Sequence, residues 1–251
     1  LAMSWLFIRD TRHHVALESA SSAMPRLTNV FWQTTWSHRN LGSITQAGLI
    51  NNLNDGMVWG LLPVLLASKG FALDQIGIIV ATYPAAWSVT QLYTGKLADK
   101  NCKKTLLALG MLVQGVALVA MVSANSFAVF VLLALLLGFG TALVYPTFLA
   151  AISDYSHPDQ RSKTIGIFRL WRDLGYAFGA VLTGVIADQF GLAAPVLAIG
   201  LLTLLSSAVV QYRMTCAPQR ITESDSHSNS SGKARAEGPS PSIHFSVVTP
   251  G

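Results

Sequence analysis

Long apolar segments separated by short polar connections dominate the chain from residue 46 to residue 212. Residues 105–153 contain no Asp, Glu, Lys or Arg, and a stretch of this length suffices for two bilayer crossings of about 20 residues each. A water-soluble fold could not solvate the outside of such a stretch. The pattern predicts six membrane-spanning segments, at 46–68, 75–97, 105–123, 127–150, 164–187 and 191–212.

These segments are expected to be helices rather than barrel strands. In lipid only helices and closed barrels satisfy the backbone, and barrel strands would show alternating polarity over about ten residues. The predicted fold class is therefore an all-α membrane protein, a bundle of six transmembrane helices. We expect residues 1–45 to be a cytoplasmic N-terminal segment, 46–212 the transmembrane domain, and 213–251, rich in Ser, Gly and Pro, a disordered cytoplasmic tail.

The basic residues are placed as membrane topology requires. Only 12% of the chain is charged, about half of the roughly 25% typical of soluble domains. Every second connection between the apolar segments carries basic residues, and these connections lie on one side of the membrane. The connections on the opposite side carry one basic residue, Lys69. The residues on the basic side are Lys96, Lys100, Lys103, Lys104, Arg161, Lys163, Arg213 and Arg220. The positive-inside rule then predicts a plasma (inner) membrane protein with both termini in the cytoplasm. The net charge of +5 could suggest a nucleic-acid partner, but the basic residues lie in short loops between apolar segments, so no nucleic-acid partner is expected.

Soluble enzyme chemistry leaves no signature in the sequence. The histidines and acids form no metal-type set, and Cys102 and Cys216 have neither metal-type nor redox-type spacing. A nucleotide-binding Gly-rich loop and a nucleophile–base arrangement are also missing from the sequence pattern. We therefore predict that the protein is not an enzyme and uses no cofactor or metal.

The first predicted helix carries amides and an acid inside the membrane. Asn51 and Asn52 lie four and three residues before Asp55, so the three side chains are expected to share one face. An ionisable group in this position costs on the order of 3 kcal/mol unless it is paired or hydrated. The face is predicted either to line a substrate or proton pathway or to form an interhelical hydrogen-bond network.

The fourth and fifth predicted helices add further candidates for the pathway. Tyr145 precedes Pro146, which should bend its helix. Arg169 and Asp173 have the spacing of an ion pair, and Arg172, adjacent to Asp173, is expected to point elsewhere. A gating or coupling role and snorkelling to the membrane surface both account for these charges. The spacing Gly175-x-x-x-Gly179 predicts close helix packing.

The connection after the second predicted helix reads Gly95-Lys-Leu-Ala-Asp99-Lys100-Asn-Cys-Lys103-Lys104. As a positive-inside loop it needs no further function, but it also resembles the signature loop Gly-x-Leu-Ala-Asp-Arg-x-Gly-Arg-Lys of the major facilitator superfamily. There too the loop follows the second helix of a six-helix half. Cys102 departs from the second glycine, and lysines replace arginines. The resemblance implies that Asp99 makes charge contacts that hold one conformation, with Gly95, Lys100, Lys103 and Lys104 in the same gating loop.

The resemblance implies a secondary transporter of a small molecule or ion that works by alternating access and is coupled to protons. The six helices would be its C-terminal half, and residues 1–45 would then belong to the central loop of a longer chain. The partners implied are the lipid bilayer and a missing N-terminal half or a second copy. One acid, several amides and no row of aromatic sugar platforms favour efflux, as in an antiporter. The alternative is a six-helix membrane scaffold or assembly partner that transports nothing.

Overall fold

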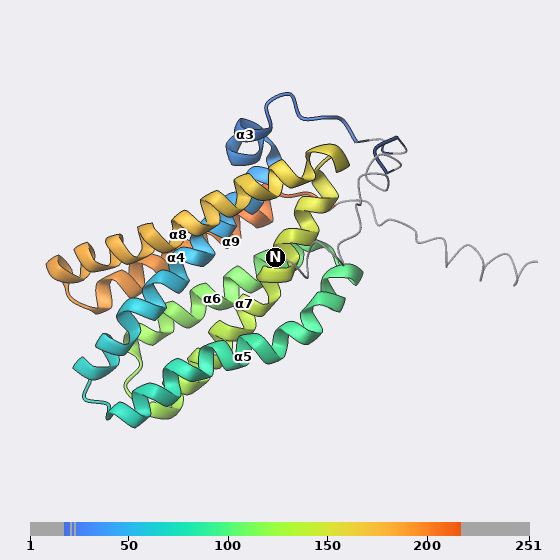
Figure 1. Cartoon of the computed structure of the whole chain (residues 1–251). Helices are drawn as coiled ribbons and strands as arrows, with labels where there is room; N and C mark the ends of the chain where they lie inside the picture. The colour runs from blue at the N-terminus through green and yellow to red at the C-terminus, as the bar shows by residue number, and fades with distance from the viewer. Residues whose placement is uncertain (1–17, 21, 23, 217–251) are drawn as a thin grey trace, which may run out of the picture. The chain divides into compact units, whose positions relative to one another are not determined.

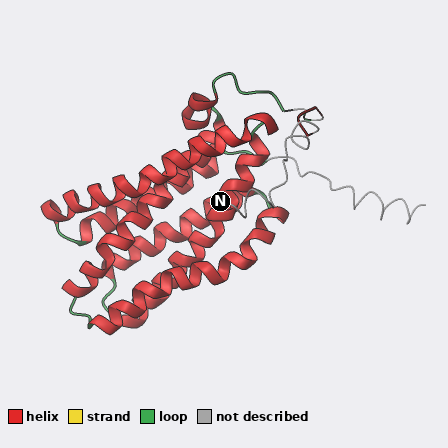
Figure 2. Cartoon of the chain, in the orientation of Figure 1, coloured by secondary structure: helices red, strands yellow, loops and turns green. Residues whose placement is uncertain are grey.

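The computed structural model describes residues 18–20, 22 and 24–216, and all regular elements in these ranges are helical (Figure 2). Two short helical elements, α3 (Val30–Trp32) and the π-helix η1 (Gln33–Ser37), precede the bundle, and a 3-10 turn, η2 (Pro158–Gln160), lies within it. The long helices are α4 (Arg39–Ser68), α5 (Leu73–Lys100), α6 (Lys103–Ser123), α7 (Phe127–Tyr155), α8 (Arg161–Phe190) and α9 (Ala193–Arg213).

Each predicted segment coincides with one long helix, so the six-helix prediction is confirmed. Several helices extend into polar sequence: α4 begins at Arg39, where the His38 side chain accepts a hydrogen bond from the Leu41 amide at 3.2 Å. Hydropathy missed these turns because it reports the lipid-facing length, whereas the extra turns are polar. By length and composition alone, α6, α7 and α9 are long and apolar enough to cross a membrane.

The helices pair in a pattern with internal two-fold character (Figure 1). Helix α4 packs on α8, α5 packs on α7, and α6 packs on both α7 and α9. The first three long helices correspond to the last three: α4 to α7, α5 to α8 and α6 to α9. Under this correspondence the contact between α4 and α8 is equivalent to the contact between α7 and α5. The chain therefore builds one bundle from two three-helix units that exchange their middle helices.

Glycines allow the closest helix pairs to approach. A Cβ added at Gly179 of α8 would lie 2.6 Å from the Leu53 carbonyl oxygen of α4, and one at Gly175 would meet the Leu49 carbonyl oxygen. A Cβ on Gly138 of α7 would lie 2.5 Å from the Tyr83 carbonyl oxygen of α5. The predicted packing role of the Gly175 and Gly179 spacing is confirmed.

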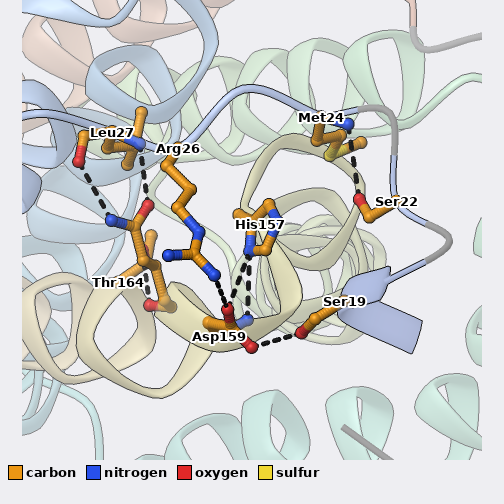
Figure 3. A network of polar contacts seen from close by, with 9 residues as sticks. Ser19, Ser22, Met24, Arg26, Leu27, His157, Asp159 and Thr164 are labelled. Carbon is orange, nitrogen blue, oxygen red and sulfur yellow. Dashed lines mark hydrogen bonds and ion pairs between the residues drawn. The ribbon is translucent and has the colours of Figure 1, made fainter. Parts of the chain in front are cut away.

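The segment before α3 forms hydrogen bonds and an ion pair with η2, which connects α7 to α8 (Figure 3). Asp159 accepts hydrogen bonds from Ser19 Oγ and from the Arg26 guanidinium, the latter at 2.5 Å, and Gln160 Oε1 accepts from the Leu27 amide at 2.8 Å. The Ser19 hydrogen bond, with the Arg26 charge, lowers the pKa of Asp159. The predicted tail and the first residues of the chain, 217–251 and 1–17, lie outside the described residues.

Candidate functional site

Asp55 of α4 lies at the centre of a hydroxyl-lined site. Its side chain is only 2% exposed. Tyr83 of α5 donates a hydrogen bond to Asp55 Oδ1, and Tyr176 of α8 donates one to Oδ2 at 3.2 Å. Tyr83 also lies 3.3 Å from the hydroxyl of Thr141 in α7. Four helices therefore converge on one carboxyl group, and its described direct partners are hydroxyls rather than an ion-paired Lys or Arg.

Next to the carboxyl group lies a second polar cluster with unused donors. Tyr145 of α7 donates to Asn52 Oδ1 at 3.1 Å, and its ring centroid lies 4.6 Å from that of Trp87 in α5. Asn52 Nδ2 and Trp87 Nε1 are buried and have no hydrogen-bond partner within the described part of the chain. Because buried donors without partners are costly, these two groups are suited to a ligand that carries hydrogen-bond acceptors.

The other amides of α4 form a separate network deeper in the bundle. Gln114 of α6 donates to Asn51 Oδ1 at 3.1 Å and accepts from Asn54 Nδ2 at 3.1 Å. Thr203 of α9 donates to Asn54 Oδ1 at 2.7 Å. These groups satisfy one another across three helices, which is the arrangement expected of polar side chains that join membrane helices.

The expectation that Asn51, Asn52 and Asp55 share one face is therefore only partly met. Asn52 and Asp55 point toward α5, α7 and α8, whereas Asn51 points toward α6, and only a 3.4 Å contact from Asn51 Nδ2 to Asn52 Oδ1 joins the two sets. An α-helix has 3.6 residues per turn, so adjacent residues point about 100° apart. Asn51 and Asn52 therefore lie on opposite sides of the direction of Asp55 and meet different helices.

Sequence reasoning did not include several partners of these networks. Gln114 carried a usable signal, since it is the one polar side chain between Leu106 and Val122. Tyr83 also carried one, since it precedes Pro84 as Tyr145 precedes Pro146, and a proline-bent helix either lines a pathway or is an ordinary kink. Tyr176 carried none, because a tyrosine in a membrane helix is equally common at lipid interfaces.

The prediction that Arg169 and Asp173 of α8 form an ion pair is wrong. Arg172, rather than Arg169, pairs with Asp173: Nε and one terminal nitrogen lie 2.9 and 2.7 Å from Asp173 Oδ1. Helical spacing favours i, i+4 pairs, but Asp173 is 58% exposed, and the long Arg172 side chain reaches it along the helix surface. Arg169 is exposed, and it makes no ion pair with a described residue.

The connection between α5 and α6, which resembles the superfamily signature loop, is shorter in the structure than the sequence pattern predicts. Helix α5 runs to Lys100 and α6 begins at Lys103, so Gly95 and Lys100 are helical and Lys104 lies in the first turn of α6. Lys103 Nζ lies 3.3 Å from Asp154 Oδ2 and joins α6 to the end of α7. Asp99 belongs to α5, but its side chain is not among those the structure describes.

A disulfide adds a covalent tie at this loop. Cys102 bonds to Cys216, which follows α9, with a Cα–Cα distance of 5.6 Å. The spacing of the two cysteines did not predict the bond, because they are 114 residues apart and no local pattern reports on such a separation.

A family comparison agrees with the geometry of the bundle. The sequence model described as Major Facilitator Superfamily matches residues 45–248. The chain belongs to this superfamily. Its members are membrane transporters, so this chain is an integral membrane protein of a transporter family.

Individual relatives are distant and longer than this chain. The quinolone resistance protein NorA of Staphylococcus aureus is 26% identical over 136 residues, which are 54% of this chain and 35% of NorA. The uncharacterized MFS-type transporter YddS of Bacillus subtilis is 32% identical over 126 residues, which are 49% of this chain and 29% of YddS. The chain thus spans about a third of the curated relatives it matches.

A solved structure shares the fold. The bacterial homologue of the human lysosomal transporter Spinster, in an inward-facing and unoccupied conformation, superposes with a TM-score of 0.61 at 17% identity. The match covers 73% of this chain and 44% of that protein. The superfamily fold assigned from the sequence is confirmed, and the six helices correspond to about half of it.

Proposed function

We propose that this chain is the C-terminal six-helix half of a proton-coupled exporter that works by alternating access, with Asp55 as its proton carrier. The observation that carries the proposal is the position of Asp55. Its carboxyl group is buried among four helices of a membrane protein and is held by two tyrosine hydroxyls. Acids inside membrane bundles are costly to retain and commonly serve as proton relays in transporters.

The substrate is proposed to bind beside this carboxyl group. Asn52 Nδ2 and Trp87 Nε1 offer two donors, and the Trp87 and Tyr145 rings offer an apolar surface. An uncharged or cationic organic molecule with acceptor groups fits this chemistry, because the carboxylate would tolerate a cation. Export is favoured by the likeness to NorA, a quinolone resistance protein.

The site is proposed to be completed by a second six-helix unit. Tyr176 is 38% exposed, and Trp87 and Tyr145 are only half-buried, so these side chains form an open polar and aromatic surface. A missing N-terminal half or a second copy would cover it. In this arrangement both termini lie in the cytoplasm of a plasma membrane protein, and the gating loop, including Asp99, faces the same side.

The decisive experiment is proton-coupled transport by the intact native protein carrying Asp55→Asn. In proteoliposomes with an imposed pH gradient, we expect the variant to insert normally and to lose substrate movement driven by the gradient. Substrate exchange without a gradient should persist, because the amide keeps the shape of the side chain. Its oxygen can still accept from one tyrosine hydroxyl, and its NH2 group can donate to the other.

A matched control is Asp173→Asn, which removes an exposed acid from α8. Its transport is expected to follow the gradient as in the wild type. Gradient-driven transport that is equal in Asp55→Asn and the wild type would eliminate Asp55 as the proton carrier.

A further inference from the structure

A hollow of about 480 Å³ lies on the outside of the bundle, between α3 and the beginning of α8. It is separate from the polar site around Asp55. Its lining is Val30, Phe31, Lys163, Gly166, Ile167 and Leu170. The hollow is thus apolar except for one cation, and neither the superfamily assignment nor the proposed transport explains it.

The wall contributed by α8 is a single stripe. Lys163, Gly166, Ile167 and Leu170 follow the spacing i, i+3, i+4, i+7 and so share one face of the helix. Lys163 lies in the first turn of α8, near the end of the bundle, and the apolar members follow toward its middle. The stripe therefore changes from charged to apolar in the direction in which a phospholipid changes from headgroup to acyl chain.

Gly166 keeps the hollow open. A Cβ added at Gly166 would meet nothing within 4 Å, whereas those at Gly175 and Gly179 of the same helix would collide with α4. Gly166 is thus not required for helix packing. Because glycine in a helix costs roughly 0.5–1 kcal/mol relative to alanine, its presence at an open position is consistent with a use for the space.

The other wall places the hollow at the membrane surface. Phe31, Trp32 and Trp36 of α3 and η1 are 48%, 58% and 64% exposed. Tryptophans of membrane proteins concentrate at the headgroup level. Lys163 is exposed and forms no ion pair with an acid in the described ranges, so its charge is available to a headgroup.

We propose that the hollow binds one anionic phospholipid, with an acyl chain over Gly166 and the phosphate group near Lys163. Charge complementarity selects this occupant: Lys163, which has no ion-pair partner among the described residues, lies at the edge of an open apolar hollow and matches an anionic headgroup joined to a hydrocarbon chain. Basic pockets between or beside membrane helices bind anionic lipids by the same physics.

The test is native mass spectrometry of the full chain released from detergent micelles that contain equimolar phosphatidylglycerol and phosphatidylcholine with identical acyl chains. We expect the wild type to retain one phosphatidylglycerol preferentially. Lys163→Gln should reduce this retention about fivefold, the effect of about one basic residue near an anionic surface, and Lys163→Arg should restore it.

Filling the hollow gives an independent measurement. Gly166→Leu should abolish preferential retention, because the new side chain projects into the open space. The matched control is Gly184→Leu in the same helix, where an added Cβ also meets nothing within 4 Å, and its retention should equal that of the wild type.

Three results would overturn the proposal. One is retention that is unchanged in both Lys163→Gln and Gly166→Leu. Another is an equal loss in Gly166→Leu and Gly184→Leu, and the third is displacement of the lipid by excess inorganic phosphate, which would reduce the site to an anion contact. None of these measurements depends on transport, so the lipid site and the proposed function fail or succeed separately.

Discussion

The close approach of α4 and α8 can be tested with one added methyl group at Gly179. The Cβ of Gly179→Ala would lie 2.6 Å from the Leu53 carbonyl oxygen and 3.0 Å from Leu53 Cα. Ordinary contacts begin near 3.4 Å, so the two helices must separate by about 0.8 Å, or the backbone must bend. The obstacle is main chain and cannot be relieved by a rotamer change.

The free energy change combines two opposing effects. Overpacking of this kind costs about 1–3 kcal/mol, and replacing a helical glycine by alanine gains about 1 kcal/mol. Gly184→Ala in the same helix receives the gain without the cost, because its Cβ meets nothing within 4 Å. The two variants should therefore differ in free energy of unfolding by about 1–3 kcal/mol, with Gly179→Ala the less stable.

The measurement is unfolding of each purified variant in mixed detergent and SDS micelles, followed by tryptophan fluorescence. A functional readout accompanies it, because Tyr176 lies one turn before Gly179 and donates to Asp55 at 3.2 Å. Separating α4 from α8 should weaken this hydrogen bond and slow transport in the intact protein. Equal stability of the two alanine variants would refute the assigned packing.

Three further predictions concern other contacts. Gln114→Leu leaves Asn51 and Asn54 without a shared partner and should lower the free energy of unfolding by about 1–3 kcal/mol. The control Gln91→Leu, in a more exposed position on α5, should leave the free energy of unfolding unchanged. Equal effects of the two substitutions would contradict the hydrogen-bond network. The pKa of Asp159 is lowered in the folded protein, so the stability contributed by Asp159 is present above the usual value of 3.8 and is lost as pH falls through the lowered pKa. The protection of the Leu27 amide from hydrogen exchange, relative to an unstructured amide at the same pH, should therefore fall in that acid range, and Asp159→Asn should lower it already at neutral pH; protection that is unchanged in both cases would argue against the contact. The wild type should show a mobility difference between reduced and non-reduced samples on SDS gels, and Cys102→Ser should abolish it; a wild type that migrates identically in both conditions, with both thiols open to alkylation without reductant, would exclude the Cys102–Cys216 bond.

The local sequence pattern was sufficient to predict the six helices and part of the candidate site. Hydropathy and charge placement report on the solvent around each segment, and lipid permits few backbone structures, so six helices could be read from the chain without any knowledge of their neighbours. The amides and the acid at Asn51, Asn52 and Asp55 were conspicuous for the same reason, since polar groups in lipid are costly.

Tertiary structure alone decided the partners. Tyr83 and Tyr176 lie 28 and 121 residues from Asp55, and Cys216 lies 114 residues from Cys102. Helical periodicity relates positions only three or four residues apart, so it could not show which helix each face of α4 would meet. Helical spacing predicted an ion pair between Arg169 and Asp173. The flexible side chain of Arg172 forms the ion pair with Asp173 instead.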